Sequence, residues 1–150
     1  AADIASIPTS AFGYNDAAGT VVATFRANDV TSKQQYIVGT NSESSRWIYS
    51  NQSSAQIFSY DGSTTAAVSG WAAGIESTAA TATGQSSRSS VLDGGAVNQT
   101  TTNGNIASLP TTLYFGGSST ASDRYLNGHI KSIKYYPRRL SNAQLQELTT

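Results

Sequence analysis

Short segments in which apolar and polar residues alternate recur along the first half of the chain. Alternation with a period of two places successive side chains on opposite faces of a β-strand. In the third such segment, for example, Trp47 and Tyr49 share one face and Ile48 takes the other. The pattern predicts strands in the segments TVVATFRAN (20–28), QQYIVGTN (34–41), RWIYSN (46–51) and AQIFSYDG (55–62).

Turn signals and one later apolar segment extend this pattern toward the C-terminus. Asp-Gly occurs in YDGS (60–63) and LDGG (92–95), and it favours a type I′ turn, whose two central residues need positive φ angles. TTLYFGG (111–117) is typical of a buried strand, whereas residues 72–108 have few apolar positions and indicate polar strands and long loops. Many short strands and one terminal helix predict an all-β fold, an antiparallel jelly-roll sandwich with a short C-terminal helix.

The last strand, within residues 126–136, has a break in its alternation. Ile130 falls on one alternating face, whereas Ile133 and Tyr135 fall on the other. All three side chains point inward only if one extra residue is absorbed near Lys131 and Ser132, as in a β-bulge. We therefore expect a bulge in this strand.

Residues 140–149 predict a helix of about two turns. Ser141 as N-cap and Gln144 three positions later form a capping box, and Leu140 is placed to contact Leu145 across it. So short a helix is not stable alone, because tertiary packing supplies most of helical stability. We therefore expect Leu145 and Leu148 to dock on the body of the domain.

Length and composition indicate a single domain, since 150 residues suit one hydrophobic core. Residues 1–19 are small and polar with Pro8 among them, and we interpret them as an N-terminal arm or linker that joins the domain near Phe12 and Tyr14. Residues 20–150 are then the jelly-roll domain. The chain opens with AADIAS and not methionine, as expected of a processed chain or a segment of a longer one.

Charge and cysteine content narrow the range of partners. Nine basic and nine acidic residues give a net charge of zero. The sequence therefore lacks the excess of positive charge that favours binding to nucleic acid or an anionic membrane. Cysteine is absent, which excludes disulfides and thiolate metal sites. There is also no apolar run long enough to span a membrane. We expect neither nucleic-acid binding nor membrane insertion.

The C-terminal third carries a resemblance to a known family. LYFGG (113–117) and LNGHIKSIKYYPRRLSNAQLQELT (126–149) resemble the ending of concanavalin A-like (laminin-G-like) jelly rolls in bacteriophage virion proteins such as tail fibres. FGYNDAAGTVVATFRAN (12–28) resembles the first strand of such domains, and SSVLDGG (89–95) a later strand and its turn. The resemblance implies two curved sheets, a last strand beside the first, and a place on the virion surface. By analogy with phage fibres and spikes, which are commonly trimers, a homotrimer is one possible assembly.

The superfamily includes glucanases, so catalysis needs a test against the residues. Those enzymes place two carboxylates two or four residues apart on one strand face. Here no two carboxylates are close in sequence, and the acidic residues are Asp3, Asp16, Asp29, Glu43, Asp61, Glu76, Asp93, Asp123 and Glu147. The only histidine, His129, is interpreted as a half-exposed strand residue. We expect a non-catalytic domain.

A metal site has little support in the sequence. Asp61, Asp93 and Asp123 stand in predicted loops, where lectin-like relatives often hold calcium with carboxylate and backbone oxygens. None of the three belongs to a dense run of Asp and Asn. We therefore expect no metal and no cofactor.

Sugar binding would use aromatic faces with polar groups beside them. The candidates are Trp47, Tyr49, Tyr60, Trp71 and Tyr125, with Asp61, Asn98 and Arg124 as possible hydrogen-bonding partners. Aromatic residues at alternate strand positions more often belong to a core, which is the alternative for both tryptophans. Binding residues concentrate on loops. The expected ligand-binding residues are therefore Tyr60, Asp61, Arg124 and Tyr125, with Trp71 kept as a further candidate.

These observations favour a non-catalytic adhesion or carbohydrate-binding domain of a phage virion protein that recognises host-surface glycans. The alternative is a structural decoration or assembly domain of the capsid or tail that binds other virion proteins. An enzyme that acts on polysaccharide is the third hypothesis.

Overall fold

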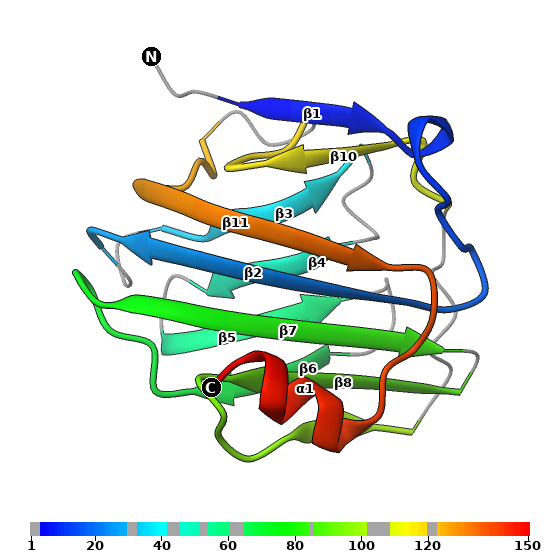
Figure 1. The fold of residues 1–150 in the computed structure, drawn as a ribbon. Helices are drawn as coiled ribbons and strands as arrows, with labels where there is room; N and C mark the ends of the chain where they lie inside the picture. Colours follow the sequence, from blue (N-terminus) through cyan, green and yellow to red (C-terminus); the bar gives the residue numbers. More distant parts are fainter. Residues whose placement is uncertain are drawn as a thin grey trace.

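The computed structural model describes residues 4–29, 33–41, 46–51, 54–60, 65–84, 86–101, 109–119 and 123–150. In these residues the chain forms two antiparallel β-sheets packed face to face, with a short helix on the outer face of one sheet (Figure 1). This confirms the predicted all-β sandwich with a C-terminal helix.

Each sheet is built from strands that are far apart in the sequence. In the described residues, sheet A has the order β1 (Ala5–Pro8), β10 (Thr112–Phe115), β3 (Gln35–Thr40), β4 (Arg46–Asn51), β5 (Ser54–Tyr60) and β6 (Thr65–Ser69). Sheet B has the order β11 (Gly128–Tyr136), β2 (Gly19–Ala27), β7 (Glu76–Gly84), β8 (Ser87–Leu92) and β9 (Asn98–Thr100). A 3-10 turn, η1 (Thr9–Ala11), follows β1, and the helix α1 (Asn142–Leu148) follows β11.

The predicted strands appear within two residues of their expected ends, with one local error. In β4 the register toward β5 shifts between Arg46 and Tyr49. Trp47 and Ile48 therefore both enter the core, whereas Tyr49 lies on the other face. The polar segment 72–108 forms β7, β8 and β9 where it is described. Of the expected turn YDGS (60–63), all but Tyr60 lies outside the described residues.

The expected N-terminal arm contributes a strand to the sandwich. β1 pairs with β10 in antiparallel register, with Ile7 opposite Leu113. Phe12 and Tyr14 then pack against the core. The sandwich therefore begins near Ala5, ahead of the boundary expected at residue 20, because an edge strand this short and exposed has little alternation to reveal it.

The Asp-Gly turn of LDGG has the predicted geometry. Asp93 and Gly94 have φ angles of 48° and 67°, and Gly95 N–H donates to Leu92 O at 2.9 Å. The Asp93 carboxylate also accepts a hydrogen bond from Thr78 N–H at 2.6 Å, which fixes the turn to the start of β7.

The bulge predicted in the last strand is present. The register between β11 and β2 shifts between Ile130 and Ser132. As a result Ile130, Ile133 and Tyr135 all pack against the core. The strand also ends opposite the start of β2, with Tyr136 beside Thr20, so the fold closes only when the C-terminal segment is in place.

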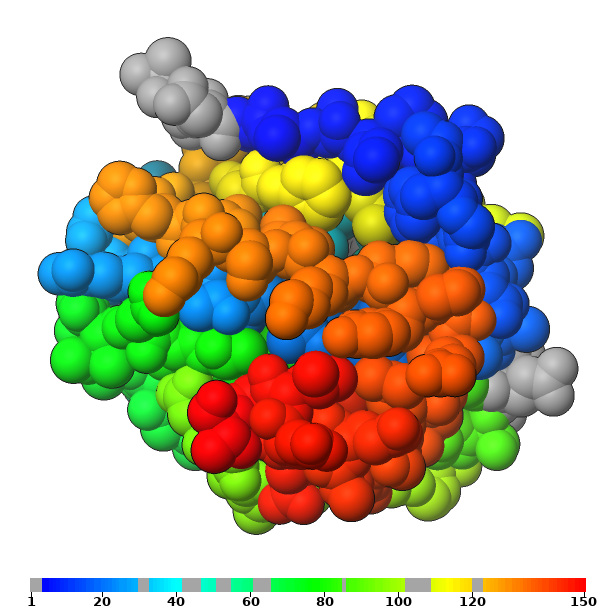
Figure 2. Space-filling model, viewed as in Figure 1, coloured from blue at the N-terminus to red at the C-terminus, as the bar shows by residue number. Residues whose placement is uncertain are grey.

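The helix α1 begins at the predicted capping box. Ser141 Oγ accepts from Gln144 N–H at 3.3 Å, and Gln144 Oε1 accepts from Ser141 N–H at 3.0 Å. Leu145 is fully buried, and Leu140 and Leu148 pack beside it in a cluster on the outer face of sheet B. Figure 2 shows this C-terminal segment in red on the face it covers, next to the orange of β11.

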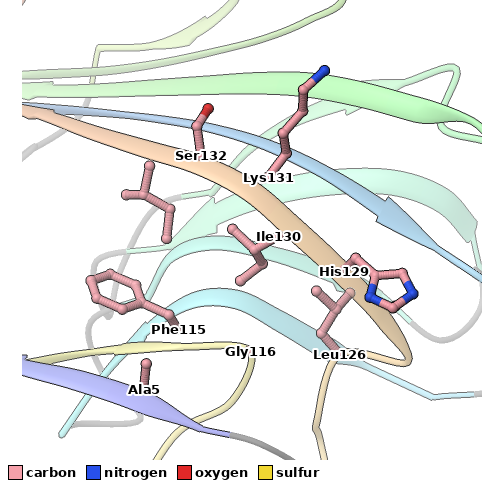
Figure 3. A pocket seen from close by; sticks show the side chains of 10 residues that line it. Ala5, Phe115, Gly116, Leu126, His129, Ile130, Lys131 and Ser132 are labelled. Carbon is pink, nitrogen blue, oxygen red and sulfur yellow. The ribbon is translucent and has the colours of Figure 1, made fainter.

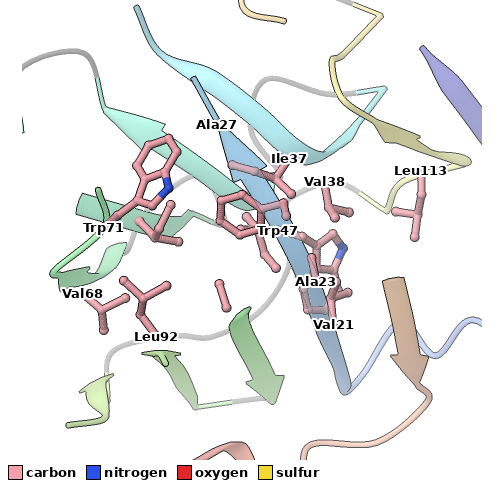
Figure 4. Close-up of a cluster of buried hydrophobic side chains, with 14 residues drawn as sticks. Val21, Ala23, Ala27, Ile37, Val38, Trp47, Val68, Trp71, Leu92 and Leu113 are labelled. Carbon is pink, nitrogen blue, oxygen red and sulfur yellow. The ribbon is translucent and has the colours of Figure 1, made fainter. Parts of the chain in front are cut away.

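The main core fills the space between the two sheets (Figure 4). Trp47 and Trp71 are both 2% exposed, and the Trp71 ring meets Phe25 edge to face at a centroid distance of 5.9 Å. Sheet B supplies small residues such as Ala23 and Ala79 opposite these rings, so bulky and small side chains interdigitate.

Alkaline pH should weaken the fold through Tyr14, whose ring stacks on Tyr135 at 5.3 Å. Burial and the adjacent Tyr135 phenol raise the pKa of Tyr14 above its ordinary value. The unfolded chain therefore loses this proton first, so the free energy of unfolding should fall as pH rises through about 10. Urea unfolding between pH 8 and 11 would show the decline, and an equally steep decline in Tyr14→Phe would contradict this cause.

Candidate functional site

The outer face of sheet A carries a second group of aromatic side chains, separate from the core. Strand alternation produces it: Ile57 of β5 points into the core, and Phe58 points to the opposite side. We call the group the aromatic face, and it consists of Tyr36, Tyr49, Phe58 and Tyr60.

The rings of the aromatic face form a continuous row across β3, β4 and β5. The Tyr36 and Tyr49 rings lie 6.0 Å apart, and Tyr49 stacks on Phe58 at 5.5 Å. Tyr36 and Tyr49 are 1% and 7% exposed, whereas Phe58 and Tyr60 are partly exposed. The accessible part of the row is therefore its Phe58 and Tyr60 end.

Arg124 lies at the Tyr36 end of this row. The loop after β10 returns to β3, where Arg124 O accepts from Tyr36 N–H at 3.1 Å and Tyr125 forms a parallel bridge with Tyr36. The Arg124 guanidinium then donates from Nη1 to the Tyr36 hydroxyl at 3.1 Å. Its side chain keeps 35% of its surface exposed, with Asp123 at 3.9 Å from Nε. A cationic group is thus held beside an aromatic row.

The structure brings together part of the predicted site. Tyr60 is a member of the aromatic face and Arg124 contacts Tyr36 of the same face, although Tyr60 and Arg124 are far apart in sequence. Tyr125 is partly buried and adjoins Gly117, so its ring is mainly an anchor of the loop. Asp61 lies outside the described residues.

Three other candidates belong elsewhere. Trp71, expected as a further ligand-binding residue, has no surface from which to stack on a sugar, because its ring is enclosed between the sheets. Trp47 is enclosed in the same way, as expected from the alternative interpretation that it belongs to the core. The Asn98 amide donates to Ala67 O at 2.8 Å and holds β9 to β6.

Sequence reasoning missed Tyr36 and Phe58 as members of the site and placed Tyr49 on the same face as Trp47. A signal for them exists in QYIV (35–38) and QIFSY (56–60), where large apolar residues occupy both alternating positions. A strand that is apolar on both faces is expected to be covered on both. Such segments therefore indicate that the outer face of this sheet contacts something other than solvent.

Carboxylates and histidine are dispersed in the part of the chain that the structure describes. No group of three or more His, Cys, Asp or Glu side chains gathers there in a metal-binding arrangement. Glu76 is paired with Lys131 at 2.7 Å on the outer face of sheet B, and Asp93 is engaged in its turn. In the described residues, no helix is long and apolar enough to cross a membrane.

Comparison with known proteins identifies the fold. No protein-family model matches the chain, and no curated protein matches it in sequence. The CBM40 module of Ruminococcus gnavus IT-sialidase, solved bound to α2,6-sialyllactose, superimposes with a TM-score of 0.72 over 100% of this chain and 95% of the module, at 12% identity. The same module with α2,3-sialyllactose gives a TM-score of 0.68 over 93% and 85% of the two chains, also at 12% identity.

Trypanosoma rangeli sialidase, solved with 2,3-difluorosialic acid, matches with a TM-score of 0.66 and 16% identity. That match covers 89% of this chain but only 22% of the sialidase. At such identities the likeness concerns the fold alone. The chain has the antiparallel β-sandwich fold that the R. gnavus CBM40 module also adopts.

Proposed function

We propose that this chain is a carbohydrate-binding domain whose ligand lies on the aromatic face beside Arg124. The observation that carries the proposal is the row of rings on the outer face of sheet A, partly exposed at Phe58 and Tyr60 and bordered by a guanidinium. Aromatic rings offer a large apolar contact surface, and a few polar groups beside them fix a ligand's orientation. A fold shared with a module solved in complex with sialyllactose supports the proposal.

The chemistry of Arg124 favours a glycan that carries a carboxylate. A guanidinium has five N–H donors and pairs well with planar carboxylates, and the Arg124 guanidinium is held at the border of the aromatic face by the Tyr36 hydroxyl, with 35% of its side chain exposed. Sialylated and uronic acid-containing glycans are therefore the expected ligand class. Neutral sugars would use the rings and accept hydrogen bonds from the guanidinium, but they would lack the ion pair with it.

The proposed setting is the surface of a bacteriophage particle, where the domain would act in adhesion to host glycans. Support comes from the sequence resemblance of residues 113–149 to the endings of phage virion jelly rolls. The alternative role, a decoration or assembly domain that binds other virion proteins, is favoured by a different surface, the groove described in the next subsection.

We propose a binding role without catalysis. Asp123 lies close to Arg124 and is 69% exposed. Glu76 and Asp93 lie on the other sheet, so neither forms a pair with it across a shared ligand position. Release of reducing ends from a polysaccharide by the purified domain would contradict this part of the proposal.

The mutations that test the site are Tyr60→Ala and Arg124→Ala. Both should bind the glycans selected on an array at least about tenfold more weakly than wild type, because each removes a ligand contact of about 1.5 kcal/mol. The measurement is titration with the selected glycan, together with thermal unfolding to show that the variants fold.

Tyr114→Ala is the matched control, because Tyr114 lies on β10 of the same sheet but outside the aromatic cluster. Its affinity should equal that of wild type. If all three variants bind like wild type, the ligand does not use the aromatic face.

A further inference from the structure

An apolar groove runs between the sheets along one edge of the sandwich. It has a volume of about 560 Å³. Its lining combines the apolar side chains of Ala5, Phe115, Leu126, Ile130 and Ile133 with Gly116, Gly128, His129, Lys131 and Ser132. A second hollow of about 220 Å³ continues it toward Tyr135 and shares Phe115 and Ile133. Figure 3 shows Phe115, Leu126 and Ile130 directed into the space between β11 and β10, while the side chains of Lys131 and Ser132 extend from the opposite side of β11 at the border of the groove.

The groove exists because the two sheets do not close on this side. β1 ends sheet A and β11 ends sheet B, whereas at the opposite edge β6 contacts β8 and β9. The bulge at Lys131 increases the opening's apolar character, because it turns both Ile130 and Ile133 inward. Among the described strands, β11 pairs only with β2, so the other side of its backbone is available for a further strand.

The solvent side of β11 carries positive charge. Lys131 and Lys134 are exposed there, and Lys131 is paired with Glu76. Lys134 has no carboxylate partner among the described residues. A second copy of this chain, paired through β11, would place lysines next to lysines and would be repelled.

We propose that this groove is a docking site for an extended segment of a partner protein in which apolar residues alternate with Asp or Glu. Such a segment would add a strand beside β11, with its apolar side chains in the groove and its carboxylates beside Lys131 and Lys134. Lysines commonly protect edge strands from association, but that role does not require an open apolar groove beneath them. The site lies apart from the aromatic face and does not depend on the glycan-binding proposal.

The test uses a seven-residue probe, acetylated and amidated, in which glutamate alternates with valine. Its matched control replaces every glutamate with lysine. Titrated into the ¹⁵N-labelled domain, the glutamate probe should shift the amide signals of residues 128–136 and of Phe115, and the lysine probe should bind at least about fivefold more weakly, as expected for exposed charge pairs.

Three variants sharpen the result. Lys134→Glu should weaken the glutamate probe by about fivefold and strengthen the lysine probe, which a simple loss of folding would not do. Ala5→Trp places a large ring in the groove and should abolish binding of the glutamate probe. Arg124→Glu should leave binding of the glutamate probe unchanged while it lowers affinity for the glycan. Failure of the docking proposal can therefore be distinguished from failure of the glycan-binding proposal.

The proposal is overturned if neither probe binds, if both bind equally well, or if the shifted amides lie on the aromatic face. Sedimentation that shows the unliganded domain to self-associate through β11 would also overturn it, because the groove would then belong to a second copy.

Discussion

Deletion of residues 141–150 should prevent stable folding or lower the free energy of unfolding by about 3–5 kcal/mol. The helix buries Leu145 completely and Leu148 in part, and a fully buried leucine contributes about 1.5–3 kcal/mol. The C-terminal segment also fixes the turn after β8, since Gly94 N–H donates to Thr149 Oγ1 at 3.1 Å and Gln146 Nε2 donates to Gly95 O at 2.9 Å. Urea denaturation measures the loss.

Point variants should divide this effect into its parts. Leu145→Ala should cost about 2–5 kcal/mol through lost burial and the remaining cavity. Ser141→Ala should cost about 1 kcal/mol, because the N-cap hydrogen bond to Gln144 N–H is lost. Glu147→Ala, on the exposed side of the same helix, is the control and should change stability by less than about 0.5 kcal/mol. Unchanged stability of the deletion would show that the helix is dispensable.

The second large effect is expected from Trp71→Ala, which should lower the free energy of unfolding by about 3–5 kcal/mol. Trp71 is among the largest side chains that are fully enclosed, and its loss would leave a cavity beside Phe25 and between the sheets. Its indole N–H has no hydrogen-bond partner among the described residues. Trp71→Phe keeps most of the volume without that donor and should be clearly less destabilising.

Glycan binding by Trp71→Ala distinguishes a role of Trp71 in the core from a role in the ligand site. If Trp71 is a core residue, Trp71→Ala should bind glycan with wild-type affinity under conditions in which the variant remains folded. A variant with wild-type stability and no glycan binding would place Trp71 in the ligand site, contrary to the structure.

Local patterns predicted much of the fold. The break in alternation between Ile130 and Ile133 was enough to predict the bulge, because two inward apolar residues at odd spacing require an extra residue. Asp93 and Gly94 were likewise recognisable, since their turn needs two positive φ angles. In both cases the determining interactions lie within a few residues.

The parts that sequence did not predict depend on long-range packing. Small residues such as Ala66 and Ala67 leave β6 without a clear apolar pattern, and β1 becomes a strand only because β10 pairs with it. The position of Arg124 over Tyr36 depends on the loop after β10 returning to β3, a contact across 88 residues. Tyr60 and Arg124 could therefore be named as candidates, but nothing local in the sequence indicated that they border one surface.

The most direct test of the glycan-binding account is amide chemical-shift mapping of the ¹⁵N-labelled domain with the glycan that an array selects, beginning with α2,6- and α2,3-sialyllactose. The account predicts a saturable response centred on Phe58, Tyr60 and Arg124, with little change along β11. No binding to any glycan, or a response confined to the groove beside β11, would contradict it.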